Sequence, residues 1–176
     1  MQAVATLAGG CFWCLEAVFE RLRGVESVMP GYTGGQAEHP DYESVCGGKT
    51  GHAEAVEIHY DPAQIGYDEL LAIFFSIHDP TTLNRQGNDI GTQYRSAIFW
   101  HDERQHTTAQ AMIDELNTAG VWHAPIVTEL QRAGRFYPAE PYHRHYFAQH
   151  PEQGYCQFVI APKVEKFSQV FRDKLR

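Results

Sequence analysis

The sequence lacks any apolar run long enough to cross a membrane, and it lacks any cluster of basic residues. A membrane-spanning helix needs about 20 predominantly apolar residues, and no segment of the chain approaches that length. Its 14 Lys and Arg are outnumbered by 22 Asp and Glu, which leaves a formal net charge of −8. Because nucleic acids and anionic membranes are bound through clustered Lys and Arg, the composition argues against both kinds of partner.

The sequence also lacks the marks of a secretion signal and of a metal site. Gln2–Ala8 carries no basic residue and is too short for the apolar region of a signal peptide, so we expect a cytoplasmic protein. His143 and His145 lie two positions apart, and His101 and His106 five apart; neither spacing matches a common zinc motif. We therefore expect neither a metal nor a cofactor.

Cysteine is scarce, and its four positions are informative: Cys11, Cys14, Cys46 and Cys156. In a cytoplasmic chain of 176 residues, four cysteines point to redox catalysis or metal binding rather than to a disulfide scaffold.

The stretch Gly10-Cys11-Phe12-Trp13-Cys14 is typical of a reactive thiol at the start of a helix. The apolar residues that follow the glycines have helical spacing: Phe12, Leu15, Phe19 and Leu22. The N-terminus of this helix should lower the pKa of Cys11, and the two aromatic residues should form an apolar wall beside it. The Cys-x-x-Cys pair also fits a thiol–disulfide exchange protein, half of a zinc site or two buried cysteines.

Hydrophobic periodicity predicts alternating strands and helices. Strands are expected over Ala3–Ala8, Val25–Tyr32, His52–Tyr60, Ser96–Trp100 and Ala124–Leu130. Helices are expected over Phe12–Arg23, Tyr67–Ile77 and His101–Asn117, and from Pro162 to Leu175. This order predicts a single α+β domain over residues 1–176. We expect a two-layer α/β sandwich whose mixed sheet has a ferredoxin-like βαββαβ core, followed by an irregular C-terminal segment. The polar stretch Asp79–Arg95 has no periodic face, and a long irregular segment of this kind is usually functional.

Five motifs in chain order resemble those of the A-type peptide methionine sulfoxide reductases. They are Gly10-Cys11-Phe12-Trp13, Gly31-Tyr32-Thr33-Gly34-Gly35, Gly51-His52-Ala53-Glu54-Ala55-Val56, the run from Gln86 to Ser96, and Gly154-Tyr155-Cys156. The resemblance extends over most of Ala3–Cys156. It implies a similar sandwich fold, reduction of the S epimer of methionine sulfoxide, free or in proteins, and recycling by thioredoxin.

The resemblance also implies roles for the residues at the matching positions. Cys11 would be the nucleophile and Cys156 the resolving cysteine that forms a disulfide with it. Glu54 would be the acid, and its place on the strand face shared by apolar residues predicts burial and a raised pKa. The resemblance further implies that other side chains bind the substrate: Phe12 and Trp13 at the methyl group, Tyr42 and Tyr94 at the sulfoxide oxygen, and Asp89 through the electrostatics of the site.

Two departures from the family pattern leave alternatives open. Some relatives carry another cysteine beyond the Gly-Tyr-Cys motif, whereas none follows Cys156 in this sequence. Many relatives also carry glycine at the position of Cys14, which could therefore be an alternative resolving cysteine, a relay or a packing residue. Cys46 is expected to be a packing residue. A thiol–disulfide oxidoreductase that uses Cys11 and Cys14 remains an alternative function, and a non-catalytic zinc module built from the four cysteines is a third hypothesis.

Overall fold

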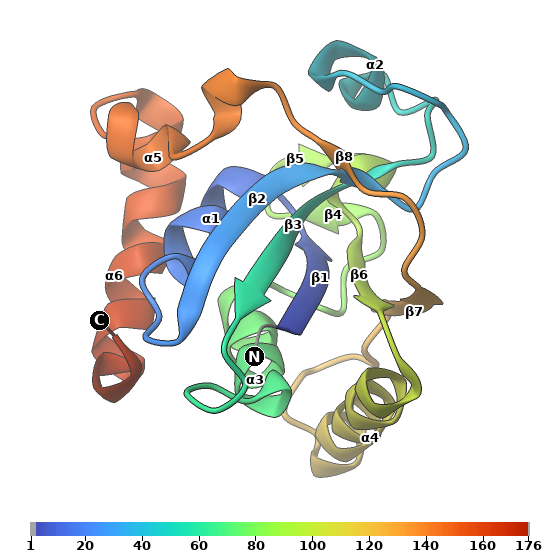
Figure 1. Ribbon diagram of the computed structural model, residues 1–176, viewed down its shortest axis with the longest axis vertical. Coiled ribbons are helices and arrows are strands. Elements are labelled where there is room, and N and C mark those ends of the chain that lie inside the picture. Colours follow the sequence, from blue (N-terminus) through green and yellow to red (C-terminus); the bar gives the residue numbers. More distant parts are fainter. Residues whose placement is uncertain (1–2, 176) are drawn as a thin grey trace.

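The computed structural model of the protein describes residues 3–175. A six-stranded sheet with the order β7-β6-β1-β3-β2-β8 forms the centre of the molecule (Figure 1). Its strands are β1 (Ala3–Gly9), β2 (Val25–Thr33), β3 (Ala53–Tyr60), β6 (Ser96–Trp100), β7 (Glu129–Arg132) and β8 (Tyr137–Pro138). A separate hairpin pairs β4 (Arg85–Gln86) with β5 (Asp89–Ile90).

Helices α1, α3 and α6 contribute to one large core, and α4 packs beside β6 and β7 (Figure 1). The helices are α1 (Phe12–Phe19), α2 (Tyr42–Cys46), α3 (Tyr67–Ile77), α4 (Glu103–Ala119), α5 (Tyr146–Gln149) and α6 (Ala161–Val170). A π-helical turn over Cys156–Ile160 leads directly into α6. Within residues 3–175, no helix combines the length and the apolar character that a membrane crossing requires.

The central four strands have ferredoxin-like topology. In the order β6-β1-β3-β2 every neighbouring pair is antiparallel, and α1 and α3 provide the two crossovers. The added strand β7 runs parallel to β6, which makes the sheet mixed. The predicted α+β class with a mixed sheet is therefore confirmed.

Successive side chains along each strand point to opposite faces of the sheet, so each face carries its own apolar cluster. On β3, Val56 and Ile58 belong to the large core under the helices, whereas Ala53 and Ala55 belong to a thin second cluster on the opposite face. Glu54 shares the face of Val56 and Ile58, as its position in the sequence predicts. The strand therefore directs this carboxyl toward the helices.

The segment after β7 crosses the thin face of the sheet to reach the far edge. Phe136 packs on the second cluster, and Tyr137 pairs with Tyr32 of β2. Gly31 permits this approach, because a Cβ at that position would lie 2.4 Å from the carbonyl oxygen of Tyr137 and 2.5 Å from the Phe136 ring. The chain then continues past the start of α1 toward Cys156. The predicted irregular C-terminal segment thus wraps around the domain.

Some predicted boundaries were wrong. Helix α1 ends at Phe19 rather than Arg23, because the chain turns so that Leu22 can form a β-bridge with Leu175. Leu175 is consequently not part of the last helix, which ends at Val170. The strand expected from Ala124 begins only at Glu129.

Two features explain why this strand starts late. Pro125 has no N–H to donate to a ladder, and the Val127 N–H donates to the carbonyl of Pro80 (2.8 Å) rather than to the sheet.

Candidate active site

Cys11 lies where the chain passes from β1 to α1. It occupies the N-cap position of α1 with extended backbone (φ −64°, ψ 124°), and its thiol makes no capping hydrogen bond. The preceding Gly10 has φ +96°, a conformation that favours glycine. A Cβ on Gly10 would also lie 2.8 Å from Cγ of Gln86. The turn and the close approach of β4 both therefore require glycine before the cysteine.

The carboxyl group of Glu54 lies against the first turn of α1. Its Oε1 accepts a hydrogen bond from the Phe12 backbone N–H (3.2 Å), and the residue is 1% exposed. Its Oε2 is buried and has no hydrogen-bond partner within residues 3–175. Burial raises the pKa of Glu54 to about 8, with the Phe12 N–H opposing the shift and the charge of Asp89 adding to it. Glu54 is therefore mostly protonated at neutral pH.

The expectation of a lowered pKa at Cys11 was wrong. Burial raises the pKa of this thiol well above its ordinary value, and the neighbouring groups Cys14 and Glu54 add to the shift. A helix N-terminus typically contributes only about 0.3–1 kcal/mol to an adjacent charge. Full burial can shift a pKa by up to about 3–5 units, or about 4–7 kcal/mol. Desolvation therefore outweighs the helix dipole.

Cys14 lies one helical turn along α1, and its thiol is hydrogen-bonded to that of Cys11. This bond is the largest cause of a lowered pKa at Cys14; burial opposes it, and the positive charge of Lys163 adds to the lowering. Of the two thiols, Cys14 is therefore the one that ionises more readily.

Aromatic rings surround the thiols at the start of α1. The indole of Trp13 stacks on Tyr146 with 3.8 Å between ring centroids and 7° between planes. Its Nε1–H donates to Nδ1 of His143 (3.0 Å). Phe12 is fully buried and stacks on Tyr42 with 6.4 Å between centroids. Rings from three separate parts of the chain therefore cluster on the first turn of α1.

Asp89 reaches this site from the β4–β5 hairpin. Its Oδ2 accepts a hydrogen bond from the Tyr155 hydroxyl (2.6 Å), and the Tyr155 ring meets Trp13 edge-on at 5.9 Å. Burial raises the pKa of Tyr155, and the neighbouring Cys11 and Cys14 add to the shift. The hydroxyl therefore stays protonated and ties the hairpin to the segment that carries Cys156.

Tyr42 and Tyr94 also belong to the site. Burial is the largest cause of the raised pKa of each hydroxyl, and the charge of Glu54 is the next. Both hydroxyls therefore remain protonated donors that lie within electrostatic range of Glu54. Cys46, expected to be a packing residue, is instead exposed at the end of α2, and its thiol is hydrogen-bonded to Tyr42.

Cys156 is completely buried at the first position of the π-helical turn. Burial raises its pKa, and the charge of Cys14 adds to the shift, so Cys156 lies within electrostatic range of Cys14. Although the sequence predicts an irregular C-terminal segment, this cysteine is packed into the large core.

Several residues of the site were not predicted. His143, Tyr146 and Tyr155 contact Trp13 although they lie far along the chain. Glu140 accepts hydrogen bonds from the Tyr32 hydroxyl (2.9 Å) and from a backbone N–H of α2 (3.0 Å). Tyr155 lay inside a quoted motif, but no sequence signal linked it to Asp89, which is 66 positions away.

The described residues contain one cluster of three potential metal ligands, and it includes none of the cysteines. Glu16, Glu20 and His145 form this cluster. The hypothesis of a zinc module built from cysteines therefore has no ligand set in residues 3–175.

A hydrogen-bonded thiol pair beside a protonated carboxyl is suited to two-electron sulfur chemistry, with one group to attack and another to donate a proton. The fold and site thus define a thiol-dependent oxidoreductase of the α+β class. The family model described as "Peptide methionine sulfoxide reductase" matches residues 3–175, and the chain belongs to this family. It is an oxidoreductase that acts on methionine sulfoxide.

Curated relatives agree over nearly the whole chain. The peptide methionine sulfoxide reductase MsrA of Deinococcus radiodurans is 57% identical over 175 residues, covering 99% of this chain and 85% of the relative. An MsrA of Thermus thermophilus is 55% identical over 175 residues, covering 99% of this chain and 98% of the relative.

Solved structures of Mxr1 from Saccharomyces cerevisiae show the same fold. The reduced form has a TM-score of 0.82 and 36% identity, covering 88% of this chain and 89% of the yeast chain. An unusual oxidized form has a TM-score of 0.65 and 33% identity, covering 86% of this chain and 83% of the yeast chain. Mxr1 in complex with Trx2 has a TM-score of 0.58 and 24% identity, covering 82% of this chain and 84% of the yeast chain.

Proposed function

We propose that the protein reduces the S epimer of methionine sulfoxide, free or in proteins, with Cys11 as nucleophile and Glu54 as acid. The observation that carries this proposal is the unpartnered Oε2 of a buried, protonated Glu54 beside the helix turn that bears the thiol. A sulfoxide oxygen leaves only after it is protonated or strongly hydrogen-bonded. Glu54 has a proton to give and no internal acceptor for it within residues 3–175.

The first step transfers two electrons from sulfur to sulfur. The Cys11 sulfur attacks the electrophilic sulfoxide sulfur while Glu54 protonates the oxygen, which gives an intermediate with an S–S bond and a hydroxyl group on the methionine sulfur. The hydroxyl group then transfers to the Cys11 sulfur as the S–O and S–S bonds to methionine break and the thioether leaves. Cys11 is thereby oxidised to a sulfenic acid, and the sulfoxide is reduced. The raised pKa of Cys11 requires the thiol to lose its proton as it attacks. In our proposal the neighbouring Cys14, whose pKa is lowered, accepts that proton in its thiolate form.

The aromatic residues favour one orientation of the sulfoxide. In our proposal Phe12 and Trp13 contact the S-methyl group, which selects the epimer. Tyr42 and Tyr94 donate hydrogen bonds to the oxygen, together with Glu54. Asp89 acts through Tyr155 and through its charge, which helps to keep Glu54 protonated.

Cys11 sulfenic acid must next be resolved by a second thiol. The family resemblance implies a Cys11–Cys156 disulfide. The structure supports Cys14 as a relay toward it, because Cys14 is hydrogen-bonded to Cys11 and lies within electrostatic range of Cys156. Attack by Cys14 releases water and forms a Cys11–Cys14 disulfide. Attack by Cys156 on the Cys11 sulfur then forms the Cys11–Cys156 disulfide and releases Cys14 as a thiol.

We propose that thioredoxin reduces the final disulfide and returns the enzyme to its thiol form. Yeast Mxr1, whose reduced form is 36% identical to this chain, has also been solved in complex with Trx2, which supports this partner. Cys156 is fully buried here, so its segment must move before a second protein can reach the disulfide. The reduced and oxidized yeast structures differ in their similarity to this chain, which supports such a rearrangement.

The proposal is tested by comparing Cys11→Ser with Cys46→Ser in turnover assays with methionine-S-sulfoxide, thioredoxin, thioredoxin reductase and NADPH. We expect Cys11→Ser to be inactive and Cys46→Ser, which removes an exposed thiol of the same chemistry, to retain activity. Cys156→Ser should release methionine in the first turnover and recycle slowly with thioredoxin. Full activity of Cys11→Ser would overturn the proposal.

A thiol–disulfide oxidoreductase using Cys11 and Cys14 is the second candidate, favoured by the hydrogen bond between their thiols. Disulfide exchange through this pair would give no role to the buried, protonated Glu54. Cys14→Ser separates the two functions: sulfoxide reduction predicts that the variant still releases methionine in a first turnover, whereas disulfide exchange through this pair predicts complete loss of activity.

A further inference from the structure

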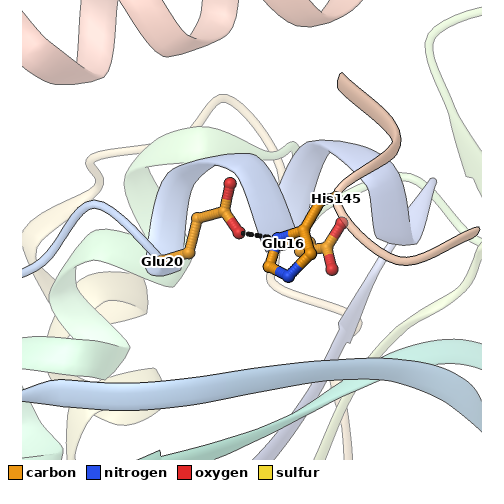
Figure 2. Close-up of side chains that lie close together, drawn as sticks. All are labelled: Glu16, Glu20 and His145. Atoms are coloured by element: carbon orange, nitrogen blue, oxygen red, sulfur yellow. Dashed lines mark hydrogen bonds and ion pairs between the residues drawn. The ribbon is translucent and has the colours of Figure 1, made fainter. Parts of the chain in front are cut away.

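A second group of titratable side chains lies near the C-terminal end of α1. Glu16 and Glu20 are four residues apart and therefore share one face of the helix, and His145 reaches them from the C-terminal segment (Figure 2). One ligand atom from each of the three lies within 4.8 Å of the others. His145 Nδ1 is 2.9 Å from Oε2 of Glu20.

The burial of Glu16 sets this group apart from an ordinary surface cluster. The residue is 1% exposed, and its Oε2 is buried without a hydrogen-bond partner in residues 3–175. Backbone N–H groups of His145 and Tyr146 interact with this carboxyl group but leave Oε2 without a partner. A buried carboxylate oxygen in that state is costly, because it loses its hydration and gains no hydrogen bond in return. A cation at the centre of the group would supply the missing interaction.

Apart from the imidazole of His145, which pairs with Glu20, no cationic side chain among the described residues forms an ion pair with these glutamates. Arg21 and Arg144 border the same surface hollow of about 700 Å³ that Glu20 and His145 line. Neither arginine forms an ion pair with Glu16 or Glu20 within residues 3–175. The guanidinium of Arg21 instead donates through Nε to the carbonyl of Ala17 (3.0 Å).

We propose that Glu16, Glu20 and His145 bind a divalent first-row transition-metal ion, with Zn²⁺ the preferred ion among those available to cells. Two carboxylate oxygens and one imidazole nitrogen form a ligand set that suits zinc. Binding requires both carboxyl groups to be ionised; their two negative charges then balance the ion, and the open hollow lets water complete its coordination. The expectation of no metal rested on histidine spacing, which cannot reveal a site whose ligands lie 125 positions apart.

Such an ion would fasten the C-terminal segment to α1. His145 has φ +54°, an uncommon conformation for histidine, and its neighbour Tyr146 stacks on Trp13. The segment continues from these residues to Cys156. The metal therefore holds a part of the chain that contacts the thiol site, without itself touching the thiols.

Binding is tested in the full-length Cys11→Ser/Cys14→Ser variant, because a thiol pair would itself capture zinc. Isothermal titration calorimetry measures Zn²⁺ affinity, and the optical spectrum of added Co²⁺ reports its ligand types. We expect one equivalent bound, with no thiolate-to-cobalt charge-transfer band. Glu20→Gln, at a half-buried position that tolerates the change, and Glu16→Gln should each weaken binding at least about tenfold.

The matched control is Glu103→Gln. Glu103 pairs with His106 at 3.4 Å on the exposed face of α4 but has no buried third ligand, so its loss should leave affinity unchanged. Zn²⁺ should also raise the melting temperature of the double-serine parent and not that of its Glu20→Gln derivative. Absence of saturable binding, equal effects of Glu103→Gln and Glu20→Gln, or a thiolate band with Co²⁺ would each overturn the proposal. No step of this test depends on turnover.

Discussion

Replacing Glu54 by glutamine should make the enzyme less active and, at neutral pH, more stable. The substitution keeps the size of the side chain but removes its acidic proton. With a pKa of about 8, Glu54 is about nine-tenths protonated at pH 7 and is positioned to act as an acid. General acid catalysis typically contributes about 10²–10⁴-fold to a rate. We therefore expect the rate of the first step to fall by about that factor in Glu54→Gln.

The raised pKa of Glu54 also predicts that Glu54→Gln increases the free energy of unfolding at neutral pH, although it lowers the activity. The pKa of Glu54 rises from an ordinary 4.5 to about 8 in the folded protein, so the fold binds this proton more tightly than the unfolded chain does. Its contribution is complete below about pH 4.5 and is lost as pH rises through about 8. At pH 7 the loss amounts to about 3 kcal/mol, which glutamine avoids because it never ionises.

Rapid-quench measurement of methionine release tests the activity, and urea unfolding from pH 5 to 9 tests the stability. The wild-type first-step rate should be flat below about pH 7 and fall above about 8, whereas Glu54→Gln should lack this fall. Glu57→Gln, on the other face of the same strand, is the matched control and should change both properties little. First-step rates within about threefold of wild type in Glu54→Gln would refute the assignment of the acid.

Other substitutions test the packing around the site. Gly31→Ala should destabilise the protein by about 1–3 kcal/mol in urea unfolding, because its Cβ would overlap backbone and ring atoms; Gly134→Ala, which has open space around it, should not. Equal stabilities of these two variants would contradict the close approach of the C-terminal segment. Tyr155→Phe loses the hydrogen bond to Asp89 and should lower the free energy of unfolding by about 0.5–1.5 kcal/mol. It should also slow disulfide formation in thiol-trapping assays, and an unchanged rate would show that this link does not position Cys156.

Short-range sequence patterns predicted much of the fold. The bounds of α3 and β6 agree with those read from periodicity, and Asp102 caps α4 by accepting a hydrogen bond from Gln105 N–H (2.8 Å). These features depend on residues within one or two turns of each other. The boundary at Phe19 depends instead on Leu175, at the other end of the chain, and no local pattern reveals it.

The residues of the site also fall into those that a local sequence pattern predicts and those that only tertiary packing brings together. Burial of Glu54 follows from alternation along one strand, and it is observed. The rings around Trp13 come from His143, Tyr146 and Tyr155, which only the path of the C-terminal segment brings together. The direction of the Cys11 pKa was wrong because the helix dipole is visible in the sequence, whereas complete burial of the thiol depends on tertiary packing.

A single-turnover experiment tests the central claim most directly. Fully reduced enzyme is mixed with excess methionine-S-sulfoxide, or separately with the R epimer, without external reductant, and the methionine released per enzyme is counted. The account predicts release from the S epimer alone. One equivalent fits a final disulfide that includes Cys11. Two equivalents, with sulfenic acid detected on Cys11, fit a final Cys14–Cys156 disulfide that leaves Cys11 free to react again. Release of no methionine, or equal release from both epimers, would contradict the account.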